Sequence, residues 1–329
     1  MRKSTTSEGF DAKLIARFAD LSASAETRRA YHRVAREFFL FVDYRDPATI
    51  APSDVQRWRD SLAAAKKSPA TIAFKLSVVR SLFHYLQRVG VASSNPALTA
   101  LVPAPTASER LRGRSLSPQE ARRLLAGPDQ SAPEGARDYA LLLLILRTAM
   151  RVGEACCLTT SSVRWSHGRW TLRLNTGARG KTDIHKERTI PLPEEVKGAL
   201  DHYLRLDAGR RGLVGSGASD AYLFQPHTNY RTLVFDKPLS SPMIWRIVKK
   251  WGDYTGLGKL SPHDLRRTAI TKALEQGLSY RQVQMMSGHK DAKTVMRYDR
   301  QSRNLERNAV NFLSYEEEGS GERPGDDHA

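Results

Sequence analysis

The stretch SPHDLRR, residues 261–267, decides much about this chain. Ser261 followed three residues later by Asp264 is the pattern of a helix N-terminal capping box. It places His263 in the first helical turn and Arg266 one turn on, so both side chains share one face. A helix N-terminus favours an anion, and an arginine fork matches phosphate oxygens. The stretch therefore predicts a phosphate site, although a capped helix with a surface arginine is the alternative.

Side chains of the same chemical kind recur in three other segments. The segments are TAMRVGE (148–154), SGHK (287–290) and VMRYD (295–299). They add Arg151, His289 and, nine residues after that histidine, Tyr298. Two arginines, two histidines and a late tyrosine suit attack of a phenolate on a phosphodiester. Arginines neutralise phosphate charge, imidazoles orient or move protons, and a tyrosine can hold phosphate covalently.

This ordered set resembles the tyrosine recombinase (phage integrase) family, and its Xer-type members most of all. The family's boxes are an arginine with an acid three residues later, a His-x-x-Arg box, and a Gly-His pair nine residues before the nucleophile. The matching residues are Arg151 and Glu154, His263 and Arg266, and Gly288, His289 and Tyr298. One position departs from the pattern, because Ala149 stands where the family commonly has glycine.

The resemblance implies how the phosphate is activated. Tyr298 attacks the scissile phosphodiester and forms a 3′-phosphotyrosine. Arg151 and Arg266 bracket the phosphate and neutralise the charge that grows on its non-bridging oxygens. Glu154 holds Arg151 in position, although an exposed salt bridge of about 0–1 kcal/mol is the plainer interpretation of that acid.

The resemblance also assigns the two histidines. His263 acts on the phenol as general base or orienting group, and His289 donates a hydrogen bond to a phosphate oxygen. Tyr280 and Tyr315 are rival nucleophiles by residue type, but neither follows a Gly-His pair at the family spacing.

The leaving 5′-hydroxyl needs a proton, which in the family comes from a lysine on a β-hairpin loop. Alternation in residues 170–174 predicts one strand, and residues 188–192 predict its partner. Lys181 lies between them and is the preferred general acid, with Lys186 as its competitor.

The expected fold is mainly α with a small β-sheet, in the α+β class. Apolar stripes at helical spacing predict a helical N-terminal region, and a proline-bearing, non-periodic stretch predicts a linker. Capping patterns at Ser68, Ser117 and Ser261 predict helix starts. The expected parts are a flexible N-terminus (1–10), a helical SAM-like core-binding domain (11–97), a linker (98–115), a catalytic tyrosine recombinase domain (116–315) and an acidic disordered tail (316–329).

Basic side chains in the N-terminal region are candidates for gripping DNA. The candidates are Arg28, Arg29, Arg33, Arg36, Lys75 and Arg80. A solvated helix face is the alternative, and the family resemblance favours the DNA-binding interpretation.

The composition narrows the class of protein further. The chain of 329 residues carries a formal net charge of +17, and because the last 14 residues have a net charge of −5, residues 1–315 carry +22, so a polyanionic partner is expected. No apolar run is long enough to cross a bilayer, and no signal peptide is evident. Cys156 and Cys157 are the only cysteines and offer neither a disulfide framework nor a metal site. The expectation is a cytoplasmic, nucleoid-associated bacterial enzyme with no metal and no cofactor.

The expected function is site-specific DNA recombination through a Holliday junction, for integration or excision of a mobile element or for resolution of DNA multimers. A homotetramer on two duplexes is expected, joined by an apolar C-terminal helix that carries Leu305, Val310, Phe312 and Leu313, with packing of this helix on its own domain as the alternative. An accessory or partner recombinase is left open. The alternatives are a type IB topoisomerase-like enzyme that relaxes DNA, and a non-catalytic DNA-binding regulator on the same scaffold.

Overall fold

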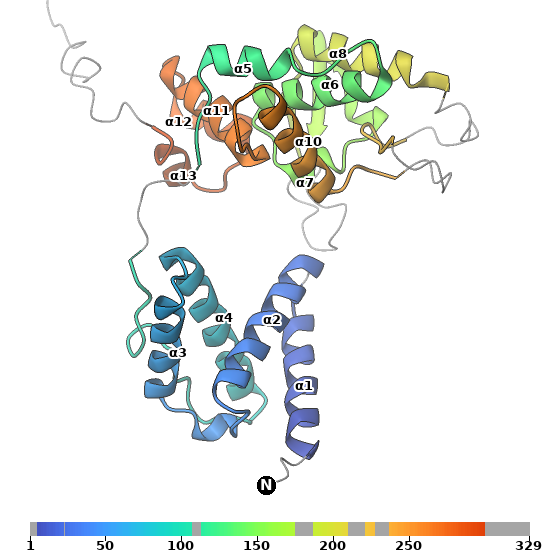
Figure 1. The fold of residues 1–329 in the computed structure, drawn as a ribbon. Coiled ribbons are helices and arrows are strands. Elements are labelled where there is room, and N and C mark those ends of the chain that lie inside the picture. Colours follow the sequence, from blue (N-terminus) through green and yellow to red (C-terminus); the bar gives the residue numbers. More distant parts are fainter. Residues whose placement is uncertain are drawn as a thin grey trace, which may run out of the picture.

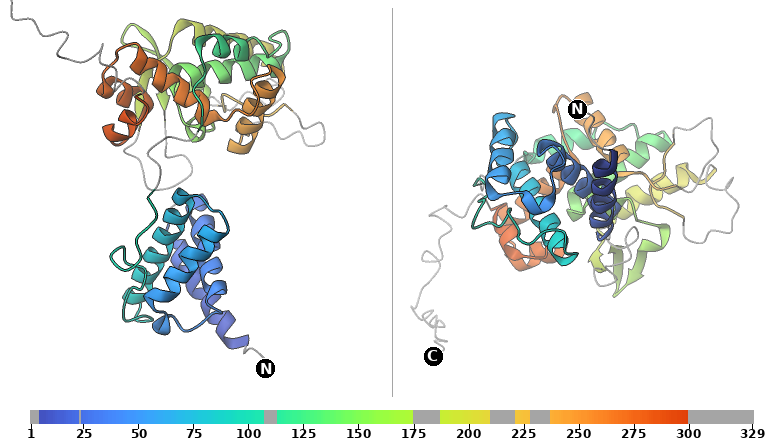
Figure 2. Two further views of the ribbon diagram at one scale, coloured as in Figure 1. Left: turned by 60° about the vertical axis from the view of Figure 1, so that its left-hand side comes forward. Right: turned by 90° about the horizontal axis from the view of Figure 1, so that it is seen from below.

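The structure of the protein is a computed structural model that describes residues 5–22, 24–106, 113–174, 187–209, 221–227 and 237–299. Helices α1–α4 gather in one body, and the elements from α5 to α13 gather in another (Figure 1). Two further views separate the same two groups (Figure 2). The described strands form one three-stranded sheet in the second body. The fold is therefore mainly α with a small β-sheet, as the sequence predicted.

The N-terminal body is built from four helices and one short 3-10 turn. They are α1 (Thr5–Asp20), α2 (Ala25–Phe41), η1 (Pro47–Thr49), α3 (Pro52–Ala64) and α4 (Pro69–Arg88). Ser24 and Ser68 cap α2 and α4 by accepting a backbone N–H. Phe38, Trp58 and Phe83 are fully buried, and the rings of Trp58 and Phe83 meet Phe38 edge-on. These large aromatic groups bury enough apolar surface to hold α2, α3 and α4 together.

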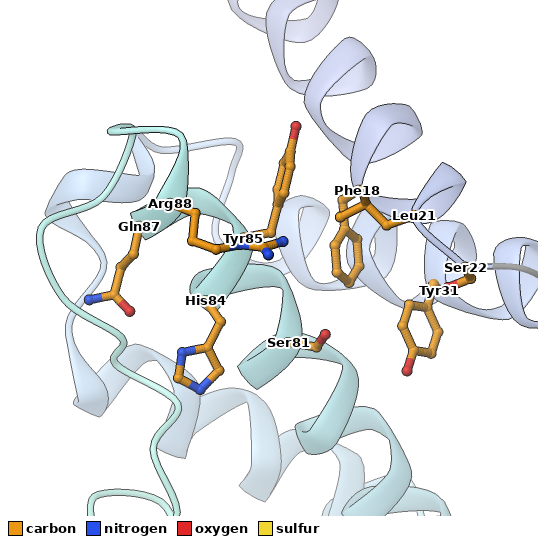
Figure 3. Close-up of a pocket in the computed structure, with 9 residues that line it drawn as sticks. All are labelled: Phe18, Leu21, Ser22, Tyr31, Ser81, His84, Tyr85, Gln87 and Arg88. Atoms are coloured by element: carbon orange, nitrogen blue, oxygen red, sulfur yellow. The ribbon is translucent and has the colours of Figure 1, made fainter.

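A hollow opens on this body between the end of α1, the start of α2 and the end of α4 (Figure 3). Phe18 stacks on Tyr31 with 5.4 Å between ring centroids, and Tyr85 lies 6.0 Å from Phe18. These ring contacts join α1 to α2 and α4. The residues that line the hollow all belong to the N-terminal body, so it is no part of the predicted phosphate site.

The second body packs helices around the small sheet. The helices are α5 (Pro118–Leu125), α6 (Pro133–Thr148), α7 (Val152–Ala155), η2 (Thr160–Ser162), α8 (Glu194–Leu206), α10 (Ser241–Tyr254), α11 (Pro262–Glu275), α12 (Tyr280–Ser287) and α13 (Ala292–Met296), and the strands are β1 (Val163–Ser166), β2 (Arg169–Leu174) and β3 (Arg188–Pro191). Helix α6 lies at the centre of this body, and most of its residues are buried.

The sheet is antiparallel in the order β1-β2-β3. Leu172 pairs with Ile190 across β2 and β3, and both side chains are buried, whereas the neighbouring Arg173 is exposed. This alternation is why the sequence predicted β2 and β3 correctly. It did not predict β1, a four-residue edge strand whose Trp165 is exposed.

The chain that enters the second body is fastened to α11. The backbone N–H of Arg114 donates to Asp264 at 2.9 Å, and that of Leu116 donates to Thr268 at 2.9 Å. Gly113 has φ +101, and a Cβ there would collide with the Asp264 carboxylate. One side of α11 therefore anchors the linker end, which leaves its other side to carry the site.

Several boundaries can be compared with the sequence predictions. The predicted helix starts at Ser68, Ser117 and Ser261 are confirmed, and the last two show the full capping box. Helix α1 begins at Thr5, earlier than the predicted helical region. The acidic tail and the predicted C-terminal helix lie outside the described residues. Within the described part of the chain, no helix is both long and apolar enough to span a bilayer.

Candidate active site

Helix α6 delivers Arg151 and Glu154 through a left-handed turn. Ala149 ends the helix with φ +52, and Arg151 then becomes the N-cap of α7. The backbone N–H of Arg151 donates to Glu154 at 2.7 Å, and its guanidinium donates to the same carboxylate at 3.2 Å. The left-handed conformation explains the family's preference for glycine at this position, because an L-residue there costs about 1–2 kcal/mol. This chain reaches the same turn with alanine.

Glu154 has a second arginine partner that the sequence analysis did not identify. Arg188, the first residue of β3, donates two hydrogen bonds to the carboxylate, at 2.5 and 3.0 Å. Glu154 is only 2% exposed. Burial raises its pKa, but hydrogen bonds from Arg188 and from the Arg151 backbone outweigh burial, so the pKa is lower than usual. Glu154 is thus a buried carboxylate that lies between two arginines, and the alternative of an exposed surface salt bridge is wrong.

Gly288 closes the same cluster from the end of α12. Its φ of +66 ends the helix in the left-handed region, and its carbonyl accepts a hydrogen bond from Arg151 at 2.7 Å. A Cβ at this position would collide with the guanidinium of Arg188. Glycine therefore allows α12 to reach both arginines.

Arg266 lies at the centre of the cluster and is 3% exposed. It donates to the carbonyl of Ala149 and, at 3.0 Å, to Nε2 of His289. Burial and the neighbouring charge of Arg151 lower the pKa of Arg266 to about 10. The guanidinium is therefore still charged at neutral pH, as a phosphate-binding group must be.

His289 is held at both ring nitrogens. Nε2 faces Arg266, and Nδ1 lies 2.7 Å from the hydroxyl of Ser287. Burial, followed by the charges of Arg266 and Arg151, lowers the pKa of His289 to about 4. The ring is therefore neutral at physiological pH.

His263 lies in the first turn of α11 and is exposed, while Arg266 on the same helix is buried. Neighbouring groups still displace part of the water around its ring; this partial desolvation lowers the pKa of His263, and the charges of Arg266 and Arg267 lower it further. This imidazole too favours its neutral form, which can accept a proton.

Tyr298 follows α13 and is 4% exposed. Its ring lies 5.8 Å from the ring of His289, and the guanidinium of Arg267 also lies 5.8 Å from the tyrosine ring. Arg267 also donates to the carbonyl of Gly113 at 2.7 Å, so one arginine contacts both the linker end and the tyrosine. Arg266 and Tyr298 lie near enough to interact electrostatically.

Tyr280 is a poor rival to Tyr298. Its hydroxyl donates to the carboxylate of Asp299 at 2.6 Å. This hydrogen bond, together with burial and the negative charge of Asp299, raises the pKa of Tyr280. A phenolate is therefore disfavoured there, and the hydrogen bond instead ties the start of α12 to the residue beside Tyr298.

The structure brings most of the predicted catalytic residues together. Those within the described residues are Arg151, Glu154, His263, Arg266, His289 and Tyr298. Lys181, Lys186 and Tyr315 lie outside the described residues. Within the described ranges, His, Cys, Asp and Glu side chains form no group of three or more that could hold a metal ion.

The predicted DNA-binding residues of the N-terminal body divide into two sets. Arg29, Arg33 and Arg36 are exposed along α2, and Arg28 donates to the carbonyl of Ser22. Lys75 instead pairs with Glu37 and is 12% exposed. Arg80 donates to the carbonyl of Ala97 at 2.9 Å. Arg29, Arg33 and Arg36 are therefore more accessible than Lys75 and Arg80.

Two known protein families match most of the chain. The phage integrase family matches residues 114–304, and the phage integrase N-terminal SAM-like domain matches residues 14–90. The tyrosine recombinase XerD of Listeria monocytogenes is 30% identical over 84% of this chain and 88% of its own length. XerD of Neisseria meningitidis is 32% identical over 68% of this chain and 69% of its own.

Solved structures share the fold at lower identity. A lambda integrase dimer bound to a COC′ core site is 17% identical with a TM-score of 0.63, covering 88% of this chain and 96% of that chain. The Tn1549 transposon integrase in complex with transposon right end DNA is 19% identical with a TM-score of 0.64, covering 87% and 93%. The chain belongs to the phage integrase family of tyrosine recombinases. It is an Xer-like, site-specific recombinase that cleaves and rejoins DNA.

Proposed function

We propose that Tyr298 is the nucleophile and that it forms a 3′-phosphotyrosine with each strand it cleaves. The observation that carries this proposal is the convergence of Arg151, Arg266 and His289 beside a single buried tyrosine. The phenolate attacks phosphorus, the 5′-oxygen leaves, and the covalent bond keeps the energy of the phosphodiester for rejoining. No cofactor is needed to drive the second step.

In this proposal the arginines act on charge and the histidines act on protons. Arg151 and Arg266 bind the non-bridging oxygens and stabilise the charge that they gain in the transition state. His263, which favours its neutral form, takes the phenol proton. Glu154 and Arg188 hold Arg151 in place. Substitution of either phosphate-binding arginine by alanine should slow cleavage by at least ~10²-fold and weaken DNA binding less.

Covalent capture tests the nucleophile and finds the DNA site together. The protein is incubated with fragmented DNA that flanks its gene, denatured, and recovered with any attached DNA. Sequencing gives the cleavage site, from which a nicked suicide duplex is made. Tyr298→Phe should bind this duplex and form no adduct. An adduct that persists in this variant would assign the chemistry to another tyrosine.

Protonation of the leaving oxygen is assigned to Lys181, with Lys186 as the alternative. A duplex with sulfur at the 5′-bridging position has a leaving group that needs little protonation. Lys181→Ala should therefore cleave the ordinary duplex poorly and the sulfur duplex well. If the sulfur duplex restores cleavage by Lys186→Ala and not by Lys181→Ala, Lys186 is the general acid.

Assembly is proposed to use four protomers on two duplexes, one for each strand that is cleaved, with exchange through a Holliday junction. The predicted apolar segment after Tyr298 joins the protomers, and the arginines of α2 grip the DNA backbone. Deletion from Asn304 onward should spare binding to a single site and remove cooperative binding and strand exchange, provided that a thermal melt shows an intact fold. A truncated protein that still exchanges strands would refute this assembly.

Exchange of strands between two labelled duplexes also separates a recombinase from an enzyme that only relaxes supercoiled DNA.

A further inference from the structure

One hydrogen-bonded chain in the site runs away from the phosphate-binding arginines into α12. Arg266 lies 3.0 Å from Nε2 of His289, and Nδ1 of the same ring lies 2.7 Å from the hydroxyl of Ser287. The Ser287 hydroxyl in turn donates to the carbonyl of Val283 at 2.6 Å. Ser287 is fully buried. Among the described hydrogen bonds, its hydroxyl reaches the site through the imidazole of His289.

The direction of each hydrogen bond in this chain follows from the groups that make it. A guanidinium can only donate, so Nε2 of His289 must present its lone pair to Arg266. The ring is neutral, so its one N–H lies on Nδ1 and points at Ser287. The serine oxygen accepts a hydrogen bond from that N–H, and its own hydroxyl donates one to the Val283 carbonyl, which can only accept. Every donor and acceptor is satisfied in this arrangement.

We propose that Ser287 is a positioning residue that sets the tautomer of His289, and that its hydroxyl supports the opposite tautomer once a phosphodiester engages Arg266. The inference rests on the proposed function for the role of the phosphate. In the free protein, Nε2 accepts from Arg266 and cannot donate to an anion. A phosphate oxygen that takes the Arg266 N–H leaves Nε2 beside an acceptor, and only the Nε2–H tautomer can then form a hydrogen bond.

A serine hydroxyl is suited to this change because it both donates and accepts and is free to rotate. After rotation the hydroxyl donates to Nδ1, which has lost its proton. The Val283 carbonyl keeps its ordinary helical acceptor role within α12. Nε2 takes a proton from solvent and Nδ1 releases one to solvent, so the charge of the site does not change. A buried alanine at this position would offer Nδ1 no partner in either tautomer, and an unsatisfied buried group is costly.

The charges around the ring favour exchange between neutral forms over protonation. Arg266 and His263 face His289 from α11, Arg151 faces it from α7, and Arg188 faces it from β3. The three guanidinium charges oppose a positive charge on the imidazole of His289. The tautomer, and not the charge, is therefore the property that Ser287 controls.

The free protein gives the first test, and it needs no DNA. Histidine is labelled with ¹⁵N, and the His289 signals are assigned by their loss in His289→Gln. In the wild-type protein, Nδ1 should have the chemical shift of a protonated nitrogen and Nε2 that of an unprotonated one. Ser287→Ala should lose the sharp Nδ1–H signal, and Ser287→Thr, which keeps a hydroxyl, should retain it. A wild-type ring protonated on Nε2, or an Ala variant with unchanged signals, would overturn the inference.

Ser279→Ala is the matched control, because Ser279 caps the other end of α12. It weakens the same helix without touching His289, so its ring signals should stay those of the wild type. A melt of each variant shows whether the fold is kept. If Thr is too large for the site, Ser287→Cys preserves the volume with a weaker hydrogen bond and should fall between serine and alanine.

The DNA-bound state gives the second test. Tyr298→Phe bound to the suicide duplex allows the ring nitrogens to be observed without cleavage, and Nε2 should now be the protonated nitrogen. An unprotonated Nε2 in this complex would refute the exchange. Ser287→Ala, with Tyr298 intact, should cleave the duplex about tenfold more slowly, the factor that corresponds to one hydrogen bond lost in the transition state. Failure of the nucleophile assignment is a separate result, since it appears as an adduct in Tyr298→Phe.

Discussion

Substitution of Glu154 by glutamine should destabilise the catalytic domain strongly, although the two side chains have the same shape. The carboxylate is 2% exposed and accepts from the backbone and guanidinium of Arg151 and twice from Arg188. Glutamine keeps one accepting oxygen but turns an NH₂ group toward donors. Removing one partner of a buried ion pair costs about 3–5 kcal/mol. We expect the lower end, because the Arg151 side chain is 42% exposed and regains water.

The assay is thermal unfolding of the wild-type protein and of the Glu154→Gln variant. For a domain of this size, a loss of ~3 kcal/mol lowers the melting temperature by about 6–12 °C. Glu187→Gln is the matched control, because Glu187 pairs with Arg173 on the surface, where both side chains are well exposed. The control should change the free energy of unfolding by less than about 1 kcal/mol.

The pH dependence gives the same prediction a second, independent test. The pKa of Glu154 is lower in the folded protein than its ordinary value. Its contribution to stability is therefore complete above the ordinary glutamate pKa and disappears as the pH falls through the lower folded value. The difference in stability between the wild type and Glu154→Gln should shrink over that acidic range. A variant that melts with the wild type at neutral pH, or a difference that is undiminished in acid, would refute the buried-pair account.

Three further substitutions test the parts that surround this pair. Arg188→Lys replaces the two hydrogen bonds that Arg188 donates to Glu154 with a single charge. It should slow cleavage of the suicide duplex by about tenfold or more. Arg173→Lys, on the strand that pairs with β3, is the control and should leave the rate unchanged. Gly288→Ala should lower the free energy of unfolding by at least about 1–2 kcal/mol in chemical denaturation, because φ is positive and the methyl group meets Arg188; unaltered stability would contradict the close approach. Tyr280→Phe removes the hydrogen bond to Asp299 and should still form the covalent adduct on a denaturing gel, and loss of all adduct would make Tyr280 the nucleophile.

The parts of the fold that the sequence predicted correctly are governed by neighbouring residues. A serine cap and the acid three residues later satisfy each other within one turn, so the starts of α5 and α11 are visible at Ser117 and Ser261. The alternation of the apolar Trp170, Leu172 and Leu174 with the polar Thr171 and Arg173 reveals β2 in the same way. The family spacing then identified a set of catalytic candidates that the structure does bring together.

The parts that could not be predicted depend on contacts between distant segments. Arg188 and Glu154 are separated by two strands and a hairpin, and nothing in either local pattern indicates that they pair. Ser287 lies directly before the Gly-His pair, but its use as a hydrogen-bond partner depends on the orientation of the His289 ring. The departure at Ala149 was visible in the sequence, whereas its left-handed φ of +52 required the structure.

Accessibility is another property that local pattern did not resolve. Lys75 and Arg80 lie off the apolar stripe of α4 and were predicted to bind DNA beside the arginines of α2. The structure engages both within their own body, one with Glu37 and the other with the carbonyl of Ala97. A side chain off the apolar stripe can still be held by a neighbouring helix or turn, and only the packing decides this.

The central claim is that Tyr298 carries the DNA covalently, and identification of the attached residue tests it most directly. The adduct formed with the suicide duplex is digested with nuclease and protease, and the peptide that retains a nucleotide is sequenced by tandem mass spectrometry. The account predicts that the modified residue is Tyr298, joined to a 3′-phosphate. A nucleotide on Tyr280 or Tyr315, or a 5′-phosphate linkage, would contradict it.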